Sequence, residues 1–524
     1  MKFPLATPLV LYLSLLLDEL PLAQAIRFPV EGRIGGFSNQ NAARNLGRLG
    51  RRASITGTPD LSNVGNVQYQ TNITLNGQQF KVLVDTGSSD LSVTGTVQGA
   101  KDTGKTAEVT YAIGATSGPV KTATLDFEGY TVKDQAFIEQ SVDSSHDEGG
   151  GIIGLGPGGA SVVQSVYGQG QGDPVLDRIF RQNTSTPNFI TILLGRAGDP
   201  TDTFVGDITV GEVVQPFGNI TQQPKLPVTQ MAHRSGQHWT ALLDANGIIG
   251  PDGQKINTTK KSSGNRFNVM FDSGFTFPQV TKSVAAAIYG RVPGAKLTTV
   301  TGITGDMWTL PCSTELNVTF LFSGVQFPIH PLDTVTNAFY GPPDEHGNPT
   351  CIGAFQPTTD EQEGIDIILG MSFLRNAYIF INFGDFVDGA LAKVGDPYVQ
   401  LLPLTDPAEA HADFVQVRTN GVDHSSQLHL LPAVPDNSED DDDDDDSSSS
   451  DSGIKKYLPY IIAGSVAGGL ILIALVLYAL FGGSRRKYRR LHDPAPAGLP
   501  ATSLPNPYDN HPPPFAQYQP SRRY

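Results

Sequence analysis

The chain has 524 residues, of which 39% are hydrophobic, with 57 glycines, 38 prolines and a formal net charge of −16 at pH 7. The abundance of glycine and proline favours many turns and short strands over long helices. Much of the negative charge is concentrated in residues 436–451, so we expect no nucleic-acid partner. With two cysteines and no cluster of histidines, the sequence indicates no zinc site, and we expect no metal and no cofactor.

The first residues have the pattern of a secretory signal peptide. Lys2 is followed by an apolar run from about Leu5 to Leu17, which is too short to span a bilayer. Ala23-Gln24-Ala25 then provides the small residues of a signal-peptidase site. We therefore predict a signal peptide at 1–25, and a buried hydrophobic helix is the alternative.

Residues 26–52 carry six arginines and one acidic residue, and they end at the dibasic pair Arg51-Arg52. This pattern predicts a propeptide of a zymogen, removed after Arg52 by a dibasic-specific protease. The mature chain would then begin near Ala53. The alternative is a disordered basic linker.

The central feature of the sequence is a pair of short turns, each of which follows an apolar strand. The first is Asp85-Thr86-Gly87-Ser88, and the second is Asp272-Ser273-Gly274. Glycine allows the chain to reverse where a side chain would clash. Two such turns could place two carboxylates face to face, where they share a proton, hold a water and remove its proton.

At these residues the chain resembles the pepsin-like aspartic proteases. In both halves the Asp-x-Gly turn is followed by an apolar-apolar-Gly strand, at Gly151-Ile152-Ile153-Gly154 and at Ile367-Ile368-Leu369-Gly370. Such an internal repeat favours two related lobes. The resemblance implies an all-β, bilobal fold over 66–404, with an active-site cleft between lobes at about 66–205 and 206–404.

The resemblance also implies an aspartic-type endopeptidase, a hydrolase that cleaves extended polypeptides. Asp85 and Asp272 would be the catalytic pair. Tyr111 would lie at the tip of a flap over the substrate, and an ordinary strand tyrosine is the alternative. The two turns would be supported by Thr86, Gly87, Ser88, Ser273 and Gly274.

Three positions depart from the pattern of the resembling family. Phe275 replaces a hydroxyl residue after the second turn, Ser92 replaces a tryptophan that partners the flap tyrosine, and Ala112 replaces a glycine. Loss of a hydrogen-bond donor raises a carboxylate pKa, so we expect Phe275 to reduce activity at strongly acidic pH. The alternative function is a catalytically weak or inactive relative that binds peptides or surface partners.

The even cysteine pair favours one disulfide, and Cys312 and Cys351 match the disulfide of the second lobe in the resembling family. Glycosylation sequons support a lumenal or extracellular body. They occur at Asn72, Asn183, Asn219, Asn257 and Asn317.

The carboxyl-terminal part predicts a membrane-anchored, yapsin-like layout with a transmembrane helix. Residues 405–456 are polar and then acidic, so we predict a disordered stalk. A calcium site in the aspartate run is the alternative, although the run lacks the spaced ligands of a loop site.

Residues 461–481 are uncharged and long enough to cross a bilayer, and we predict a helix over 457–483. Basic residues follow this helix and favour a cytoplasmic tail at 484–524. We therefore expect a single-pass type I membrane protein of the secretory pathway, with an extracellular or lumenal, monomeric ectodomain.

Overall fold

The computed structural model describes most of the predicted peptidase domain. The described residues are 66, 68–111, 114–127, 129–143, 146–182, 186–200, 206–215, 217–257, 266–300, 303, 305–358, 364–387, 395–424 and 429–432, with the backbone of Ile26–Pro29. The predicted signal peptide, transmembrane helix and tail lie outside these residues, as do most of the predicted propeptide and stalk.

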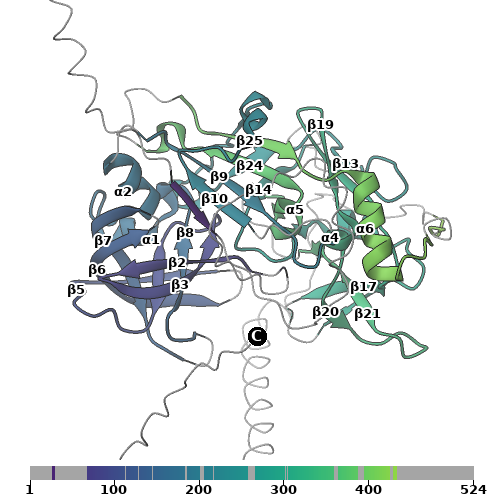
Figure 1. Cartoon of the computed structure of the whole chain (residues 1–524), viewed down its shortest axis with the longest axis horizontal. Helices are drawn as coiled ribbons and strands as arrows, with labels where there is room; N and C mark the ends of the chain where they lie inside the picture. The colour runs from purple at the N-terminus through teal and green to yellow at the C-terminus, as the bar shows by residue number, and fades with distance from the viewer. Residues whose placement is uncertain are drawn as a thin grey trace, which may run out of the picture. The chain divides into compact units, whose positions relative to one another are not determined.

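The first half of the domain is built on a seven-stranded sheet (Figure 1). β2 and β3 form a hairpin at Asn76-Gly77, and both turn residues have positive φ, which asparagine and glycine adopt most readily. In sheet order the strands are β2 (Gln70–Leu75), β3 (Gln78–Asp85), β8 (Gly150–Gly154), β4 (Leu91–Thr94), β7 (Tyr130–Gln140), β6 (Ala115–Phe127) and β5 (Lys101–Thr110).

In the part of the second half that the structure describes, the strands form three smaller sheets. The sheet that carries the second turn consists of β12 (Thr240–Leu242), β14 (Asn268–Phe271), β23 (Ile367–Leu369), β15 (Gln279–Val280) and β22 (Gln356–Pro357). The second sheet consists of β13 (Ile248–Ile249), β18 (Val318–Phe322) and β19 (Val325–Ile329). The third consists of β16 (Lys296–Thr299), β17 (Asp306–Pro311), β21 (Thr350–Gly353) and β20 (Val335–Gly341).

A six-stranded sheet joins segments from both halves of the domain. Its order is β1 (Ile26–Pro29), β10 (Gly206–Val210), β9 (Phe189–Leu194), β24 (Ala377–Asn382), β25 (Tyr398–Pro403) and β11 (Leu226–Pro227). Two features of this sheet were not expected from the sequence. β1 comes from the predicted propeptide and pairs with β10, and the predicted lobe boundary separates the neighbouring strands β9 and β10.

Within the described residues the helices are few and short, as the glycine and proline content suggests. Two of them match sequence signals, at Asp173-Pro174 for α2 and at Thr281 for α3, where Thr281 caps the helix. The helices are α1 (Val162–Tyr167), α2 (Val175–Gln182), α3 (Lys282–Tyr289), α4 (Pro331–Thr334), α5 (Met371–Leu374) and α6 (Pro407–Thr419). Short 3-10 turns lie at η2 (Gly158–Ala160), η3 (Gly218–Gln222), η4 (Arg234–Gly236) and η6 (Gly384–Phe386).

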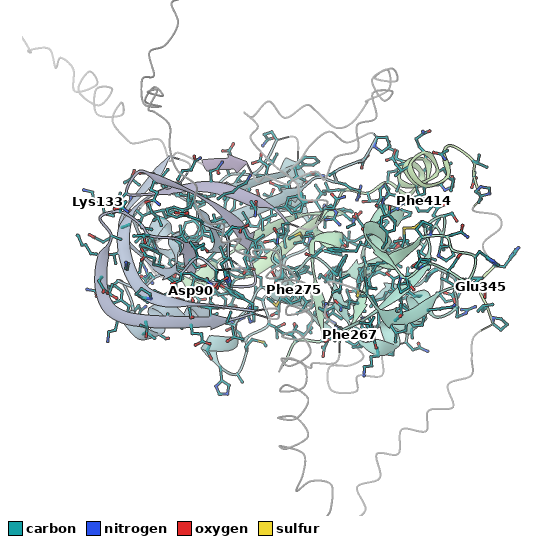
Figure 2. The ribbon with its side chains drawn as sticks, turned by 90° about the horizontal axis from the view of Figure 1, so that it is seen from below. Asp90, Lys133, Phe267, Phe275, Glu345 and Phe414 are labelled. Atoms are coloured by element: carbon teal, nitrogen blue, oxygen red, sulfur yellow. A yellow bond between two sulfur atoms is a disulfide. The ribbon has the colours of Figure 1, made fainter. Side chains whose placement is uncertain are left out.

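The prediction that residues 405–456 form a disordered stalk is wrong for the first part of that range. Helix α6 (Pro407–Thr419) is capped by Asp406 and packs against α4 (Figure 1). Two of its apolar side chains, Ala410 and Phe414, are buried. Phe414 is labelled in Figure 2. Because tertiary contacts and not composition stabilise this helix, the polar sequence did not predict it.

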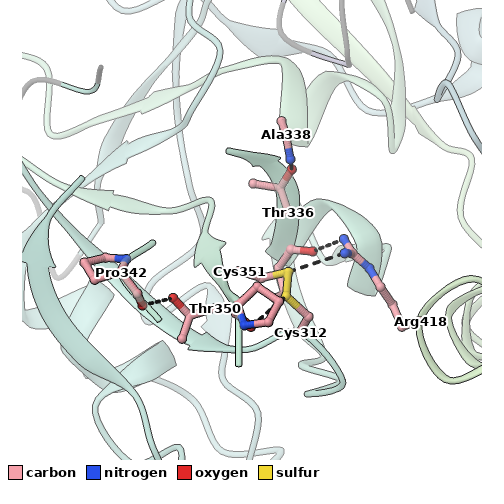
Figure 3. The surroundings of a disulfide bond; sticks show 9 residues. Cys312, Thr336, Ala338, Pro342, Thr350, Cys351 and Arg418 are labelled. Atoms are coloured by element: carbon pink, nitrogen blue, oxygen red, sulfur yellow. Dashed lines mark hydrogen bonds between the residues drawn. A yellow bond between two sulfur atoms is a disulfide. The ribbon is translucent and has the colours of Figure 1, made fainter. Parts of the chain in front are cut away.

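Cys312 and Cys351 form the expected disulfide, with their Cα atoms 4.8 Å apart. Arg418 of α6 lies against this bond: its Nη1 donates to Cys351 Sγ at 3.4 Å, and its Nη2 donates to the Val335 carbonyl at 2.8 Å (Figure 3). The end of α6 is therefore held on the strands that the disulfide joins. Across the described ranges, no helix combines the length and apolarity needed to span a membrane.

A buried ionic cluster also connects the two halves. Asp333 accepts hydrogen bonds from Arg196 Nε at 2.9 Å and from Arg375 Nε at 2.7 Å, and all three side chains are buried. Arg375 Nη1 donates to the carbonyl of Asn66 at 2.9 Å. Burial alone would raise the pKa of Asp333, but the two guanidinium groups hold that pKa well below its ordinary value.

Candidate active site

Parallel strand pairs position the two Asp-containing turns. β3 runs parallel to β8 with Asp85 opposite Gly154, and β14 runs parallel to β23 with Phe271 opposite Leu369. The N–H of Asp272 donates to the Leu369 carbonyl at 3.0 Å. The apolar-apolar-Gly strands thus hold both turns, as the internal repeat predicted.

Thr86 and Ser273 lock the two turns together beneath the carboxylates. The N–H of Thr86 donates to Ser273 Oγ at 3.1 Å, and the N–H of Ser273 donates to Thr86 Oγ1 at 2.9 Å. The two hydroxyls then donate across the junction, Thr86 to the Phe271 carbonyl and Ser273 to the Val84 carbonyl. Every polar group of this buried junction that is named here has a partner, which makes the junction rigid.

The structure brings the carboxyl groups of Asp85 and Asp272 into hydrogen-bonding contact. Both residues are buried, with 5% and 3% of their surface exposed. A Cβ atom on Gly87 would overlap the Asp272 carboxylate, and one on Gly274 would overlap that of Asp85. Only glycine at these two positions lets the carboxylates face each other.

Each carboxylate is oriented by donors from its own turn. Asp85 accepts the N–H of Gly87 at 2.8 Å on Oδ1 and the hydroxyl of Ser88 at 2.5 Å on Oδ2. Asp272 accepts the N–H of Gly274 at 2.7 Å. Burial and the adjacent charge of Asp85 together raise the pKa of Asp272 well above its ordinary value, although backbone N–H groups oppose this shift. Asp272 therefore keeps its proton to a higher pH than an exposed aspartate does.

Tyr111 lies near the first of the two turns. It directly follows β5 and is half-buried, and its hydroxyl lies near the hydroxyls of Ser88 and Thr116. Burial and the nearby charge of Asp85 raise the pKa of Tyr111. Tyr111 thus lies beside the first turn, and its role as a flap tyrosine stays a prediction.

The family model for eukaryotic aspartyl proteases matches residues 68–388 of this chain. The chain belongs to the eukaryotic aspartyl protease family. This match covers more than half of the sequence and both turns, and it confirms the predicted family, the mostly β pepsin-like fold and the prediction of an aspartic-type peptidase.

Three similar proteins each share less than 30% sequence identity with this aspartyl protease. It is 25% identical over 382 residues to major aspartyl peptidase 1 of Cryptococcus neoformans var. grubii, which covers 65% of this chain and 73% of the relative. It is 28% identical over 359 residues to an aspartic protease of Phaffia rhodozyma, with coverages of 63% and 78%. The crystal structure of aspartic proteinase from Irpex lacteus covers 65% of this chain and 95% of its own, with a TM-score of 0.47 and 20% identity.

Phe275 provides this aspartyl protease with a backbone donor but no hydroxyl beside Asp272. Its N–H hydrogen-bonds Asp272 and favours the ionised carboxylate. Its ring, labelled in Figure 2, packs instead on a small apolar cluster with Met231, Met270, Ile365 and Ile368. The side chain therefore contributes apolar contact where the sequence comparison expects a donor.

Asp90 is a buried group of the site that the sequence analysis did not single out. It accepts hydrogen bonds from Ser161 Oγ at 2.5 Å and from the N–H of Val162 at 2.8 Å, at the start of α1. Burial raises the pKa of Asp90, whereas these donors lower it. Asp90 fixes the backbone that follows the first turn. Its position directly after Ser88-Ser89 is the feature of the sequence from which this role could have been predicted.

His238 is the second group that the sequence analysis missed. The half-buried imidazole makes a hydrogen bond with the backbone of Gly87, while its Nδ1 has no partner among the described residues. Burial lowers the pKa of His238, and the Gly87 contact and Asp85 act in the opposite direction. A lone histidine before Trp239 matches no motif, so only the fold could reveal it.

One group of side chains in the described ranges has the spacing of a metal site: atoms of Asp199, His330 and Asp413 lie within 4.8 Å of one another. However, His330 Nδ1 accepts the N–H of Leu332 at 3.1 Å, so the proton of the neutral ring sits on Nε2. A protonated nitrogen has no lone pair to offer a cation. This Nε2 instead faces Asp413 at 3.7 Å, and the donor set does not fit a metal.

The predicted glycosylation sites differ in exposure. Asn219, Asn257 and Asn317 are exposed, and Asn72 is half-buried on β2. Asn183 lies outside the described residues. The exposed positions are accessible to modification, and glycosylation at all five remains a prediction.

Proposed function

We propose that this protein is an aspartic endopeptidase that hydrolyses extended polypeptides with a water held between Asp85 and Asp272. The observation that carries the proposal is the contact between the two buried carboxyl groups, held by the hydrogen bonds that Thr86 and Ser273 exchange. Two acids that share one proton supply both a base and an acid at the same place.

The mechanism assigns different roles to the two carboxyl groups. The ionised Asp85 takes a proton from the water, which attacks the scissile carbonyl carbon, while the protonated Asp272 donates to the carbonyl oxygen. The proton gained by Asp85 then passes to the leaving nitrogen as the C–N bond breaks. A hydroxyl of the tetrahedral intermediate returns a proton to Asp272, which restores the starting state of the pair. Ser88 and Gly87 orient Asp85 throughout, and Tyr111 covers the reacting groups and excludes water.

The proposal is tested with the purified full-length protein and a denatured protein substrate across acidic pH. We expect cleavage that the aspartic-protease inhibitor pepstatin blocks. Cleavage that persists with pepstatin but stops with a metal chelator would contradict the carboxylate mechanism.

A second function, peptide or partner binding without cleavage, is favoured by one observation. The ring of Phe275 packs in an apolar cluster and offers Asp272 no side-chain donor. Under this alternative the protein binds pepstatin or peptides but cleaves none of them at any pH, and the same assay separates the two functions.

We further propose that the peptidase is a monomeric ectodomain on a single-pass type I helix at 457–483, with its carboxyl terminus in the cytoplasm. The uncharged stretch at 461–481 and the basic residues that follow it support this topology. Extraction of membranes at alkaline pH should leave the protein in the pellet. Release into the supernatant would contradict the anchor, and sedimentation of the solubilised protein measures its oligomeric state.

Maturation by cleavage after Arg52 forms the last part of the proposal. The dibasic pair and the basic composition of 26–52 support it. Cleavage there would separate β1 (Ile26–Pro29) from the rest of the chain although β1 is paired with β10. Amino-terminal sequencing should show that the active protein begins near Ala53. A start at Ile26 in fully active protein would contradict the prediction of a propeptide.

A further inference from the structure

The two sulfur atoms of the disulfide differ in their exposure to solvent. Cys312 is half-buried, whereas Cys351 on β21 is fully buried. Cys312 directly follows β17, and β17 pairs with β21 with Leu310 opposite Cys351. A thiol in solution can therefore approach the sulfur of Cys312 more readily than that of Cys351. The backbone pairing of the two strands does not depend on the covalent bond.

The two sulfur atoms also differ in their electrostatic surroundings. Arg418 Nη1 donates to Cys351 Sγ at 3.4 Å (Figure 3). The other sulfur, Cys312 Sγ, lies 3.8 Å from the carbonyl oxygen of Pro349. A guanidinium group stabilises negative charge on the sulfur beside it, whereas a carbonyl oxygen disfavours such charge. If the S–S bond breaks, the negative charge is therefore more stable on Cys351 than on Cys312.

The guanidinium group of Arg418 has no carboxylate partner among the described residues. Its Nη2 donates to the Val335 carbonyl at 2.8 Å, and its buried Nε makes no hydrogen bond to a described residue. Burial lowers the pKa of Arg418 to about 10, and the phenol of Tyr340 acts weakly in the opposite direction. A thiolate on Cys351 would supply the negative charge that this side chain lacks.

We propose that Cys312 and Cys351 form a redox-active disulfide, in which a small thiol attacks Cys312 Sγ and Arg418 stabilises Cys351 as the leaving thiolate. The attacking thiolate forms a new S–S bond to Cys312 Sγ as the bond between the two cysteines breaks. The electron pair of the broken bond stays on Cys351 Sγ, and the product is a mixed disulfide on Cys312. A stabilised thiolate leaves faster in such an exchange.

The first test identifies the sulfur to which the small thiol becomes attached. The purified full-length protein is incubated with glutathione at neutral pH without denaturant, exchange is stopped with acid, and the peptides are analysed by mass spectrometry. We expect glutathione on Cys312 and a free thiol at Cys351. The absence of an adduct, or an adduct on Cys351 to the same or a greater extent, overturns the proposal.

The second test measures how fast dithiothreitol reduces the disulfide of the folded protein. Arg418→Gln removes the positive charge but keeps an amide donor, so we expect the rate to fall by about fivefold to tenfold. Arg418→Lys retains a positive charge and should react faster than Arg418→Gln. The matched control is Lys282→Gln, which removes an exposed positive charge from α3 and should react like the wild type.

A further variant separates stabilisation of the thiolate from simple covering of the disulfide by α6. Phe414→Ala removes a buried ring of α6 and keeps Arg418, so loosening of the helix should speed reduction. Reduction of folded Arg418→Gln at the wild-type rate or faster overturns the role of Arg418. Should Arg418→Gln fail to fold, the position of the adduct in the wild type decides. Both tests detect thiols, so their results do not depend on peptidase activity.

Discussion

Thr86 and Ser273 stand 187 residues apart in the chain, and each accepts the backbone N–H of the other on its side-chain oxygen. Neither half of the domain satisfies these N–H groups by itself. The exchange therefore joins the halves at the one place where the two carboxylates must meet, and it couples the geometry of the site to the stability of the fold.

Thr86→Val removes one arm of this exchange at nearly constant volume. The buried N–H of Ser273 loses its acceptor and the Phe271 carbonyl loses a donor, so we expect a loss of about 1–3 kcal/mol in the free energy of unfolding. Urea denaturation of the variant measures it. The exposed Thr96→Val serves as the control, and equal stabilities of the two variants would show that the exchange contributes nothing.

The catalytic turns could be predicted from sequence because each is encoded locally. Asp85 and Asp272 each follow an apolar strand and precede a glycine by two residues. Such a short motif is enough to predict a sharp turn beside a carboxylate. The contact between the two carboxylates could not be derived in this way. It depends on pairing between segments far apart in the chain, which only the resemblance to a known family supplied.

Asp333→Asn tests the buried cluster that joins the halves. The substitution keeps the shape of the side chain but leaves the guanidinium groups of Arg196 and Arg375 without their shared negative charge. Removing one member of a buried ionic cluster costs about 3–5 kcal/mol, and we expect the variant to lose that amount in chemical denaturation. The exposed Asp396→Asn should be neutral, and a similar result for both variants would refute the role of Asp333.

The buried side chain of His330 should make the folded protein less stable as the pH falls. Burial and then the charge of Arg196 lower the pKa of His330, whereas Asp413, Asp333 and Asp199 oppose the shift. The unfolded chain therefore takes up this proton at a higher pH than the folded protein does. The contribution of the neutral ring is complete above about pH 6.5 and is lost as the pH falls through the lowered folded value.

His330→Asn keeps an acceptor for the N–H of Leu332 but does not titrate in this range. Urea unfolding at pH 7 and pH 5 should show that the wild type loses more stability than the variant. The exposed His346→Asn is the control and should follow the wild type. Identical losses in all three proteins would contradict the assignment.

Helix α6 and His238 show what the sequence could not predict. The helix has a capping aspartate and a following proline, at Asp406-Pro407, but its apolar residues form no continuous stripe and its stability comes from packing on α4. His238 has no local signature at all, because its neighbour Gly87 lies in the other half of the chain. Both depend on contacts that the chain makes only when folded.

Phe275→Thr should restore a donor to the second carboxylate. The expected loss of activity at strongly acidic pH stays a prediction. In addition, burial and Asp85 raise the pKa of Asp272, and in a pair that works with one proton this higher pKa sets the alkaline limb of activity. A new hydroxyl donor favours the ionised form, so the alkaline limb should move downward. Phe217→Thr, in a different apolar cluster, is the control for loss of a ring. An alkaline limb that moves upward would refute this account.

The most direct test of the catalytic pair compares the full-length wild type with Asp85→Asn and Asp272→Asn on one peptide substrate at the pH optimum. Each substitution preserves size but prevents the pair from sharing a proton between an acid and a base. We predict that either one reduces kcat by at least about a thousandfold while the unfolding midpoint is retained, and that the exposed Asp396→Asn has full activity. Wild-type activity in either folded variant would contradict the assignment of Asp85 and Asp272 as the catalytic pair.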